Sequence, residues 1–283
     1  MSTNKNLLRA KSNRNDEFYT LYTDVSDELN HYRPYFVDKI IYCNCDSEKS
    51  SFVRYFKNNF KELKLKGLYA TEYNQDACGV VYYYDNDTEY KKELVSDGSF
   101  DSRDCIYYLE KSDIVVTNPP FSKFSMFFDT LINKEKDFII LGSVISTIRN
   151  NVAPYLVSGK VNLGYFYGNL TFLDDNNIPK PVKVTWYTTL PVDRKVDFLQ
   201  TGKRYLPNVY KKIDGLDCIN ISNINDIPMD YEGIMAVPIT FLHKLNKEQF
   251  KIVGLGRYFK DLFYQSYYVE DEEIFTRLFI KKL

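Results

Sequence analysis

The sequence predicts an α/β fold, a doubly wound sheet of parallel strands with helices on both faces. Short apolar runs at residues 39–43, 63–70, 114–117 and 138–141 are typical of strands that are buried on both faces. Helical segments at residues 50–60, 102–111 and 124–132 separate these runs. Such alternation of strand and helix favours a parallel sheet with right-handed crossovers.

The elements follow one another in a simple order. A helix is expected over residues 25–29, and Pro34 should end it. The aromatic run at residues 80–84 is interpreted as one arm of an inserted hairpin, and Ser102 as the cap of the helix that ends near Lys111. The β-branched run 114–117 stops at two prolines, so Asn118 should lie at the carboxyl end of a central strand.

The character of the chain changes after about residue 150. Residues 161–167, 170–173 and 182–188 are expected strands, some of which could complete the first sheet as a terminal hairpin. Residues 190–228 are basic and turn-rich, and apolar strand patterns return at 233–242 and 250–254. We therefore predict a core with an N-terminal arm over residues 1–150 and a second region, the hairpin plus a recognition part, over residues 151–283.

Length and composition exclude several classes of protein. The 283 residues suffice for one large or two modest domains. Apolar runs are too short to span a membrane, and the first residues lack the apolar stretch of a signal peptide, so a cytoplasmic location is expected. The 5 cysteines form no C-x-x-C pair and only 2 histidines are present, so we expect reduced thiols and no metal site.

Positive charge is concentrated locally although the formal net charge is −1. An N-terminal arm and the span 176–214 are both basic, and such patches can contact phosphates. The candidate nucleic-acid contacts are Lys5, Arg9, Lys11, Arg14, Lys123, Arg149, Lys183, Arg194, Lys195, Lys203 and Arg204.

Polar residues follow the successive strands, where open α/β sheets bind nucleotides. Glu72 follows the second strand, at a position where a carboxylate can accept hydrogen bonds from ribose hydroxyls. Before the strand at 114–117, an acid could accept from adenine N6 and an aromatic ring could pack on the base. The first turn lacks the glycines that are common at this position. The candidate ligand contacts lie after the first strand, at the end of the second strand and before the strand at 114–117. They are Asn44, Cys45, Asp46, Glu72, Asp97, Phe100 and Asp101.

The tetrapeptide Asn118-Pro119-Pro120-Phe121 resembles the catalytic loop of AdoMet-dependent methyltransferases that act on the amino group of a planar base or amide. Such an amine is a poor nucleophile because its lone pair is conjugated with the ring. The Asn118 oxygen and the Pro119 carbonyl can accept its hydrogens and draw the nitrogen toward a tetrahedral geometry. Phe121 offers a stacking face, worth about 1–3 kcal/mol per base.

Several further segments resemble the EcoRI-type adenine-specific DNA methyltransferases. They are residues 15–20, 41–46, 113–121 and 230–242. The resemblance implies a Rossmann-like sheet, AdoMet as methyl donor with AdoHcy as product, and N6 of a flipped adenine in DNA as acceptor. It also implies that Phe18, Tyr19 and Thr20 line the AdoMet pocket and that the later region recognises the target.

The sequence leaves three other hypotheses of function open. A glutamine-amide protein methyltransferase uses a similar loop, commonly with tyrosine in the place of Phe121. The composition does not exclude an RNA adenine methyltransferase, and a non-catalytic DNA-binding module could retain the same fold. For the DNA enzyme we expect double-stranded DNA as partner, functional pairing with a restriction endonuclease, a monomeric state, and neither a metal nor a membrane.

Overall fold

The computed structural model describes residues 20–173 and 179–283. The chain forms two compact units, each made of two segments. Unit 1 consists of Met1–Val144 and Asn162–Val192, and unit 2 of Ile145–Val161 and Asp193–Leu283. Within residues 20–173 and 179–283, each helix is too short or too polar to cross a bilayer.

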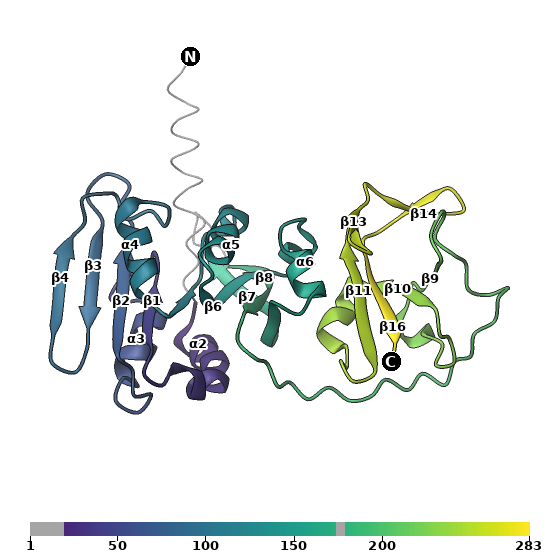
Figure 1. Cartoon of the computed structure of the whole chain (residues 1–283), viewed down its shortest axis with the longest axis horizontal. Coiled ribbons are helices and arrows are strands. Elements are labelled where there is room, and N and C mark those ends of the chain that lie inside the picture. The colour runs from purple at the N-terminus through teal and green to yellow at the C-terminus, as the bar shows by residue number, and fades with distance from the viewer. Residues whose placement is uncertain (1–19, 174–178) are drawn as a thin grey trace, which may run out of the picture. The chain divides into compact units, whose positions relative to one another are not determined.

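Unit 1 is built around a sheet with the strand order β4-β3-β2-β1-β5-β6-β8-β7 (Figure 1). The strands β2, β1, β5 and β6 pair in parallel, and an antiparallel hairpin extends the sheet at each edge. The bounds are β1 (Ile40–Cys43), β2 (Gly67–Glu72), β3 (Val80–Tyr84), β4 (Glu89–Glu93), β5 (Ile114–Thr117), β6 (Asp137–Ser143), β7 (Asn162–Leu173) and β8 (Pro179–Thr188).

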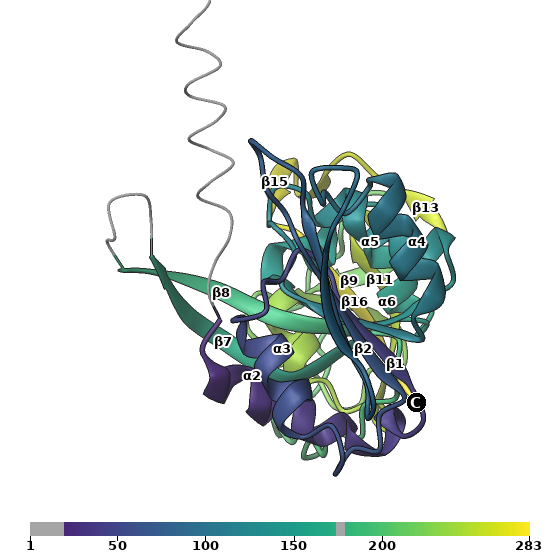
Figure 2. The same ribbon diagram turned by 90° about the vertical axis from the view of Figure 1, so that its left-hand side faces the viewer.

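Helices cover both faces of this sheet, which confirms the predicted α/β fold. Figure 2 shows α2 and α3 on one side of the strands and α4 and α5 on the other. On the first side Phe52 of α3 packs edge-to-face on Trp186 of β8, and on the second side Phe124 of α5 packs on Tyr187. The bounds are α2 (Tyr22–Leu29), η1 (Asn30–Phe36), α3 (Ser51–Asn58), α4 (Arg103–Lys111) and α5 (Phe124–Asn133).

The helical path does not stop at Pro34, contrary to the sequence prediction. It continues as the 3₁₀ helix η1 as far as Phe36. Tyr32 and Phe36 are fully buried in the core of unit 1, so their packing holds this segment in a helical conformation through the proline. The cap of α4 agrees with the prediction, since the Ser102 hydroxyl accepts a hydrogen bond from the backbone N–H of Cys105.

A buried carboxylate joins α2 to the edge hairpin. Glu28 accepts hydrogen bonds from the backbone N–H groups of Tyr165 (2.9 Å) and Phe166 (2.8 Å) and from the Tyr32 hydroxyl (2.9 Å). The two N–H groups belong to the irregular part of β7, where the register with β8 shifts between Leu163 and Tyr167. The Glu28 carboxylate therefore replaces the ladder partners that this bulge has lost.

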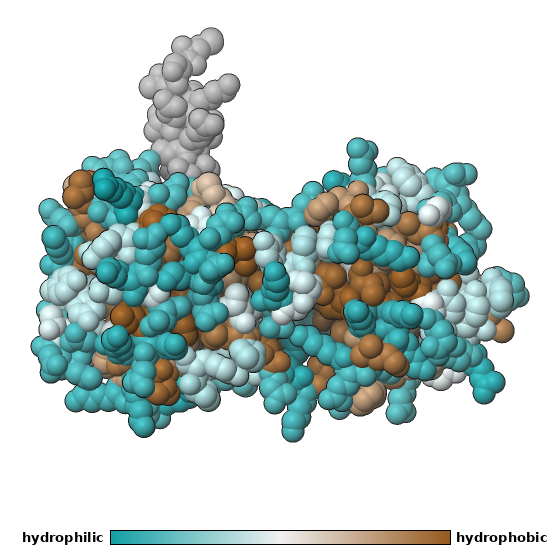
Figure 3. Space-filling view, viewed as in Figure 1, coloured by the Kyte–Doolittle hydropathy of each residue, from teal (hydrophilic) through white to brown (hydrophobic). Residues whose placement is uncertain are grey.

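Unit 2 contains a sheet with the strand order β13-β12-β11-β16-β10-β9. Its core includes Cys218, Phe259 and Phe279, and apolar side chains also gather over this part of unit 2 in Figure 3. The elements are η2 (Val144–Ile148), α6 (Ala153–Val157), β9 (Cys218–Asn220), η3 (Ile224–Asp226), β10 (Ile234–Pro238), η4 (Ile239–Lys244), β11 (Phe250–Gly256), β12 (Tyr258–Phe259), β13 (Leu262–Phe263), β14 (Tyr267–Val269), β15 (Glu272–Ile274) and β16 (Arg277–Lys282).

Candidate active site

Thr117 joins the two neighbouring strand ends of the candidate site. It is the last residue of β5, which pairs with β1, so the turn after β1 and the loop after β5 lie side by side. The Thr117 hydroxyl lies 2.7 Å from the Asn44 carbonyl oxygen and 2.8 Å from Asp46 Oδ2. A hydroxyl donates one hydrogen, and here the two acceptors share it. This contact fixes the first turn against the strand that precedes Asn118.

The first turn keeps its shape without glycine. Cys45 has φ of 57°, a left-handed conformation that costs a non-glycine residue roughly 1–2 kcal/mol. Asn44 is almost fully buried, and its Nδ2 donates to the Tyr42 hydroxyl at 2.7 Å. The Tyr42 and Thr71 hydroxyls are also 2.7 Å apart, and burial raises the pKa of Tyr42 well above its usual value. A buried network of neutral hydrogen bonds thus holds the strained turn.

The Asn118 amide is oriented by a residue far away in the sequence. Its Nδ2 donates to Thr20 Oγ1 at 3.3 Å, across 98 positions of the chain. The Thr20 carbonyl in turn accepts from the Ser51 hydroxyl at 2.7 Å, which ties the segment before α2 to the start of α3. Because the nitrogen of the amide bonds to Thr20, the oxygen of the amide points in a different direction. In the same loop Pro119 is buried and Phe121 packs against the core of unit 1.

At the end of β2, two glycines allow the backbone to approach Glu72 closely. A Cβ on Gly98 would lie 2.4 Å from the Glu72 carbonyl oxygen, and Gly98 has φ of 80°. A Cβ on Gly79 would lie 2.7 Å from the same oxygen. The Glu72 carboxylate accepts from the Tyr82 hydroxyl at 2.7 Å. Only glycine fits the two close positions, so the loop before α4 is held against the end of β2.

The three residues predicted before α4 occupy different environments. The Asp97 carboxylate accepts from the backbone N–H of Ser99 at 2.9 Å, and its carbonyl accepts from the N–H of Asn74. Phe100 is 3% exposed and packs edge-to-face on Phe127. Asp101 is exposed. Asp97 and Phe100 thus shape the loop, whereas Asp101 points to solvent.

Comparison with known proteins identifies the family. Residues 6–94 and 85–277 match the family model described as "Adenine-specific methyltransferase EcoRI". The chain belongs to this family. It is 39% identical to the Type II methyltransferase M.EcoRI of Escherichia coli, with 89% of each chain covered. It is 34% identical to M.MgeORF184P of Mycoplasma genitalium and 35% identical to M.MpnI of Mycoplasma pneumoniae, each over 87% of this chain and 84% of the relative.

The predicted EcoRI-type family is therefore confirmed, and the protein is an adenine-specific DNA methyltransferase of the restriction-modification type. Methyltransferases of this kind use AdoMet as methyl donor. Among the described residues, no three or more His, Cys, Asp and Glu side chains come together in a metal-binding group.

The described residues among the predicted DNA contacts of this methyltransferase are distributed over both units. Lys123 directly precedes α5 of unit 1, and Lys183 of β8 lies over the Tyr167 ring, 4.9 Å from its centre. Lys203 and Arg204 line a cavity of unit 2. Arg149, Arg194 and Lys195 also belong to unit 2. Phe18, Tyr19 and the arm residues Lys5, Arg9, Lys11 and Arg14 lie outside the described residues.

Sequence reasoning missed several residues that contact the candidate site. Thr117, Tyr42 and Ser51 each bond to a predicted site residue or its backbone, and Gly98 allows the close approach at Glu72. A polar residue at the end of a β-branched run was a usable signal for Thr117. The sequence around Tyr42 and Ser51 carried no such signal, because their partners are set by tertiary packing.

Proposed function

We propose that Asn118 and Pro119 hold the N6 amino group of a flipped adenine in double-stranded DNA while it accepts a methyl group. The observation that carries this proposal is the contact between Asn118 Nδ2 and Thr20 Oγ1 at 3.3 Å. It engages the amide nitrogen with the protein, so that the amide oxygen points elsewhere. An oriented acceptor of this kind is what an amine with two hydrogens requires.

The two acceptors act on the adenine amine before and during transfer. The Asn118 oxygen and the Pro119 carbonyl accept one N–H each, which weakens conjugation of the lone pair with the ring and stabilises the charge that develops on nitrogen. AdoMet, when bound, supplies a methyl group on a sulfonium, so that an N–C bond forms as a C–S bond breaks and AdoHcy leaves. The methylated nitrogen then loses its proton to water, and no strong base is needed.

The rest of the loop positions the base. Extrusion from the duplex costs a few kcal/mol, which stacking on Phe121 partly offsets at about 1–3 kcal/mol per base. Phe121 packs against the core of unit 1, and Pro119 and Pro120 restrict the backbone on its N-terminal side. Because this packing holds the Phe121 ring, less conformational entropy is lost when the base stacks on it.

The residues around the first two strand ends fit AdoMet. Carboxylates follow both strands, where ribose hydroxyls can donate to an acid, and Thr117 and Tyr82 already hold Asp46 and Glu72 in place. The backbone approach at Gly98 leaves no room for a side chain there. We assign the AdoMet pocket to the residues expected from the sequence: Phe18, Tyr19, Thr20, Asn44, Cys45, Asp46, Glu72, Asp97, Phe100 and Asp101.

The partners follow from the same proposal. Basic side chains of both units contact the DNA, and a restriction endonuclease of the same target sequence is the functional counterpart in the cytoplasm. The relatives named as Type II methyltransferases support this pairing. One protomer carries all the proposed site residues, so a monomer suffices for turnover.

The test is Asn118→Ala, measured with labelled AdoMet on DNA, on RNA and on protein. The wild-type enzyme should place label in N6-methyladenine from DNA alone. Asn118→Ala should bind AdoMet in calorimetry like the wild type and lose turnover by at least about 100-fold, as when a preorganised polar group is removed. The control is Asn86→Ala, an exposed residue in the β3–β4 turn, which should retain full activity. An active Asn118→Ala enzyme would refute the assignment of the loop.

A further inference from the structure

Unit 2 contains a cavity of about 550 Å³ between the coil at residues 202–210 and the segment at residues 220–226. Its walls include the charged side chains of Lys203, Arg204 and Asp226, the hydroxyl of Ser222, and the apolar side chains of Leu206 and Val209. Leu206 and Val209 are 53% and 58% exposed, although they are apolar. A cavity of this size is large enough for part of a nucleotide chain.

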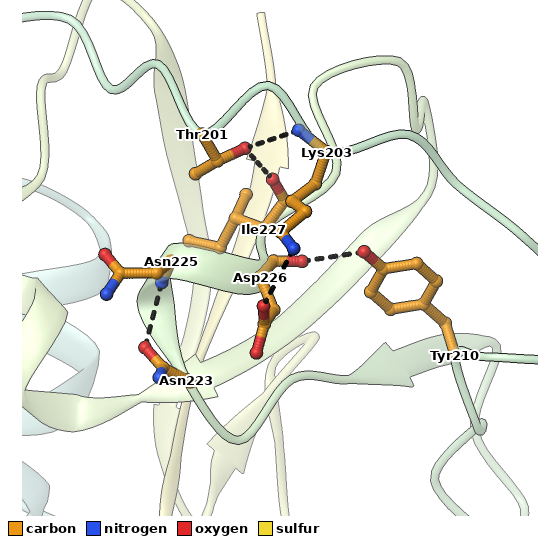
Figure 4. A network of polar contacts seen from close by, with 7 residues as sticks. All are labelled: Thr201, Lys203, Tyr210, Asn223, Asn225, Asp226 and Ile227. Atoms are coloured by element: carbon orange, nitrogen blue, oxygen red, sulfur yellow. Dashed lines mark hydrogen bonds and ion pairs between the residues drawn. The ribbon is translucent and has the colours of Figure 1, made fainter.

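The coil that forms one wall is held by hydrogen bonds, although it has no regular secondary structure. Figure 4 shows that the Thr201 hydroxyl donates to the Ile227 carbonyl at 2.6 Å and accepts from the N–H of Lys203 at 3.2 Å. The Tyr210 hydroxyl donates to the Asp226 carbonyl at 2.9 Å. The coil is thus fixed at both ends against η3 and the residue after it. The wall is preorganised, which lowers the cost of binding a ligand there.

The charged groups in the wall are only weakly engaged with one another. Lys203 Nζ and Asp226 Oδ1 are 3.8 Å apart, and the two side chains are 54% and 53% exposed. An ion pair of this kind contributes little, so the Asp226 carboxylate can exchange partners at small cost. Arg204 is exposed at the same cavity. The wall therefore offers the N–H donors of the Arg204 guanidinium, the Asp226 carboxylate as an acceptor, and apolar groups.

We propose that this cavity is a base-reading subsite for the DNA target, an inference that rests on the proposed function. Base edges are distinguished by three kinds of contact: donors to guanine O6 and N7, acceptors for the amino groups of cytosine or adenine, and apolar contact with the thymine methyl group. Arg204, Asp226 and the Leu206–Val209 pair supply one kind each. A site for phosphate alone would not include Asp226, because like charges repel. Arg204 reads a guanine and Asp226 reads an amino group of the target.

The experiment maps methylated adenines on DNA that carries no prior adenine methylation, by sequencing that detects N6-methyladenine. The wild type is compared with Arg204→Ala, Arg204→Lys and the control Arg257→Ala, an exposed arginine of unit 2 outside this cavity. Arg204→Ala should lose discrimination at one base position by about 10- to 100-fold, so that additional sequences become methylated. Arg204→Lys keeps the charge but loses the planar fork, and should relax the same position.

Each other outcome overturns the proposal. A phosphate contact would give an unchanged target sequence with uniformly weaker methylation in Arg204→Ala and recovery in Arg204→Lys. A target sequence and rate unchanged in both variants would show that the cavity does not touch the DNA. Loss of discrimination in Arg257→Ala as well would show an effect of charge and not of this cavity. A wild-type enzyme that methylates no DNA would instead refute the proposed function, and the wild-type sample alone identifies that case.

Discussion

The Thr20 hydroxyl accepts a hydrogen bond from the Asn118 amide and helps to set which way this amide points. The side chain is 8% exposed, so replacement by the nearly isosteric valine removes the acceptor and leaves the volume unchanged. Without this acceptor the amide can rotate, and under the proposed role of Asn118 its nitrogen would then face the adenine amine in place of its oxygen. Thr20 is in this sense a positioning residue for Asn118.

We expect Thr20→Val to lower kcat by roughly 5- to 10-fold, the factor that corresponds to one net hydrogen bond of about 1 kcal/mol. KM for DNA should change less than kcat, since the duplex is held by many other contacts. Thr20→Ser retains the hydroxyl and should recover most of the turnover. A Thr20→Val enzyme with wild-type kcat would show that the Asn118 orientation does not depend on this contact.

Among the elements, α2 and the edge hairpin β7–β8 depend on one another through Glu28. Glu28 is 1% exposed, and its carboxylate accepts hydrogen bonds from two backbone N–H groups of β7. Gly164 allows this contact, because a Cβ there would lie 2.1 Å from Glu28 Oε1. The helix that follows Thr20 is thereby anchored to the edge of the sheet.

Glu28→Ala should reduce the free energy of unfolding of unit 1 by about 2–4 kcal/mol, because it leaves buried N–H groups without their acceptor. Glu28→Gln keeps one acceptor oxygen and should lie between the alanine variant and the wild type. Urea denaturation followed by the fluorescence of Trp186, which is buried in β8 of the same unit, reports this change. Equal stability of Glu28→Ala and the wild type would mean that water replaces the carboxylate.

The elements themselves were largely predictable, and their long-range contacts were not. The run Ile114–Thr117 and the helix Phe124–Asn133 follow from apolar patterning, which is a local property of the sequence. The bond from Glu28 to Phe166 spans 138 positions, and no local pattern indicates it. The same holds for the left-handed turn at Cys45, which is stabilised by neighbours that packing brings together. The Asn118 loop could be predicted as the catalytic loop because its motif consists of four adjacent residues.

On the scale of the whole molecule, the two units have separate cores and should respond differently to acid. His243 lies in unit 2, with its Nδ1 2.9 Å from Arg194 Nη1. Burial, followed by the charges of Arg194 and Lys244, lowers the pKa of His243 from 6.5 to about 4. The folded unit thus takes up this proton less readily than the unfolded chain, so its stability should fall as the pH drops from about 6.5 toward 4.

Hydrogen exchange measured by mass spectrometry between pH 7 and pH 4.5, corrected for intrinsic rates, resolves the two units. Peptides of unit 2 should lose protection as the pH falls, whereas those of unit 1 serve as the internal reference. His243→Asn retains an acceptor for Arg194 without the titration, and should reduce the pH dependence of unit 2. The same acid sensitivity in His243→Asn would assign the effect to other groups.

The path of the chain has a consequence for the exchange of target specificity between relatives. Unit 2 takes Ile145–Val161 from the middle of the sequence, and the chain then returns to unit 1 to form the hairpin before Asp193. A chimaera made by fusion at a single junction between Val161 and Asp193 would separate α6 from β11, which pack together in unit 2. A junction before Ile145 would instead separate β8 from β6, with which it pairs in unit 1. A transplant must carry both segments. Under the proposed reading of the target by unit 2, substitutions within unit 2 preserve this packing, whereas a single-junction fusion disrupts one of the two units.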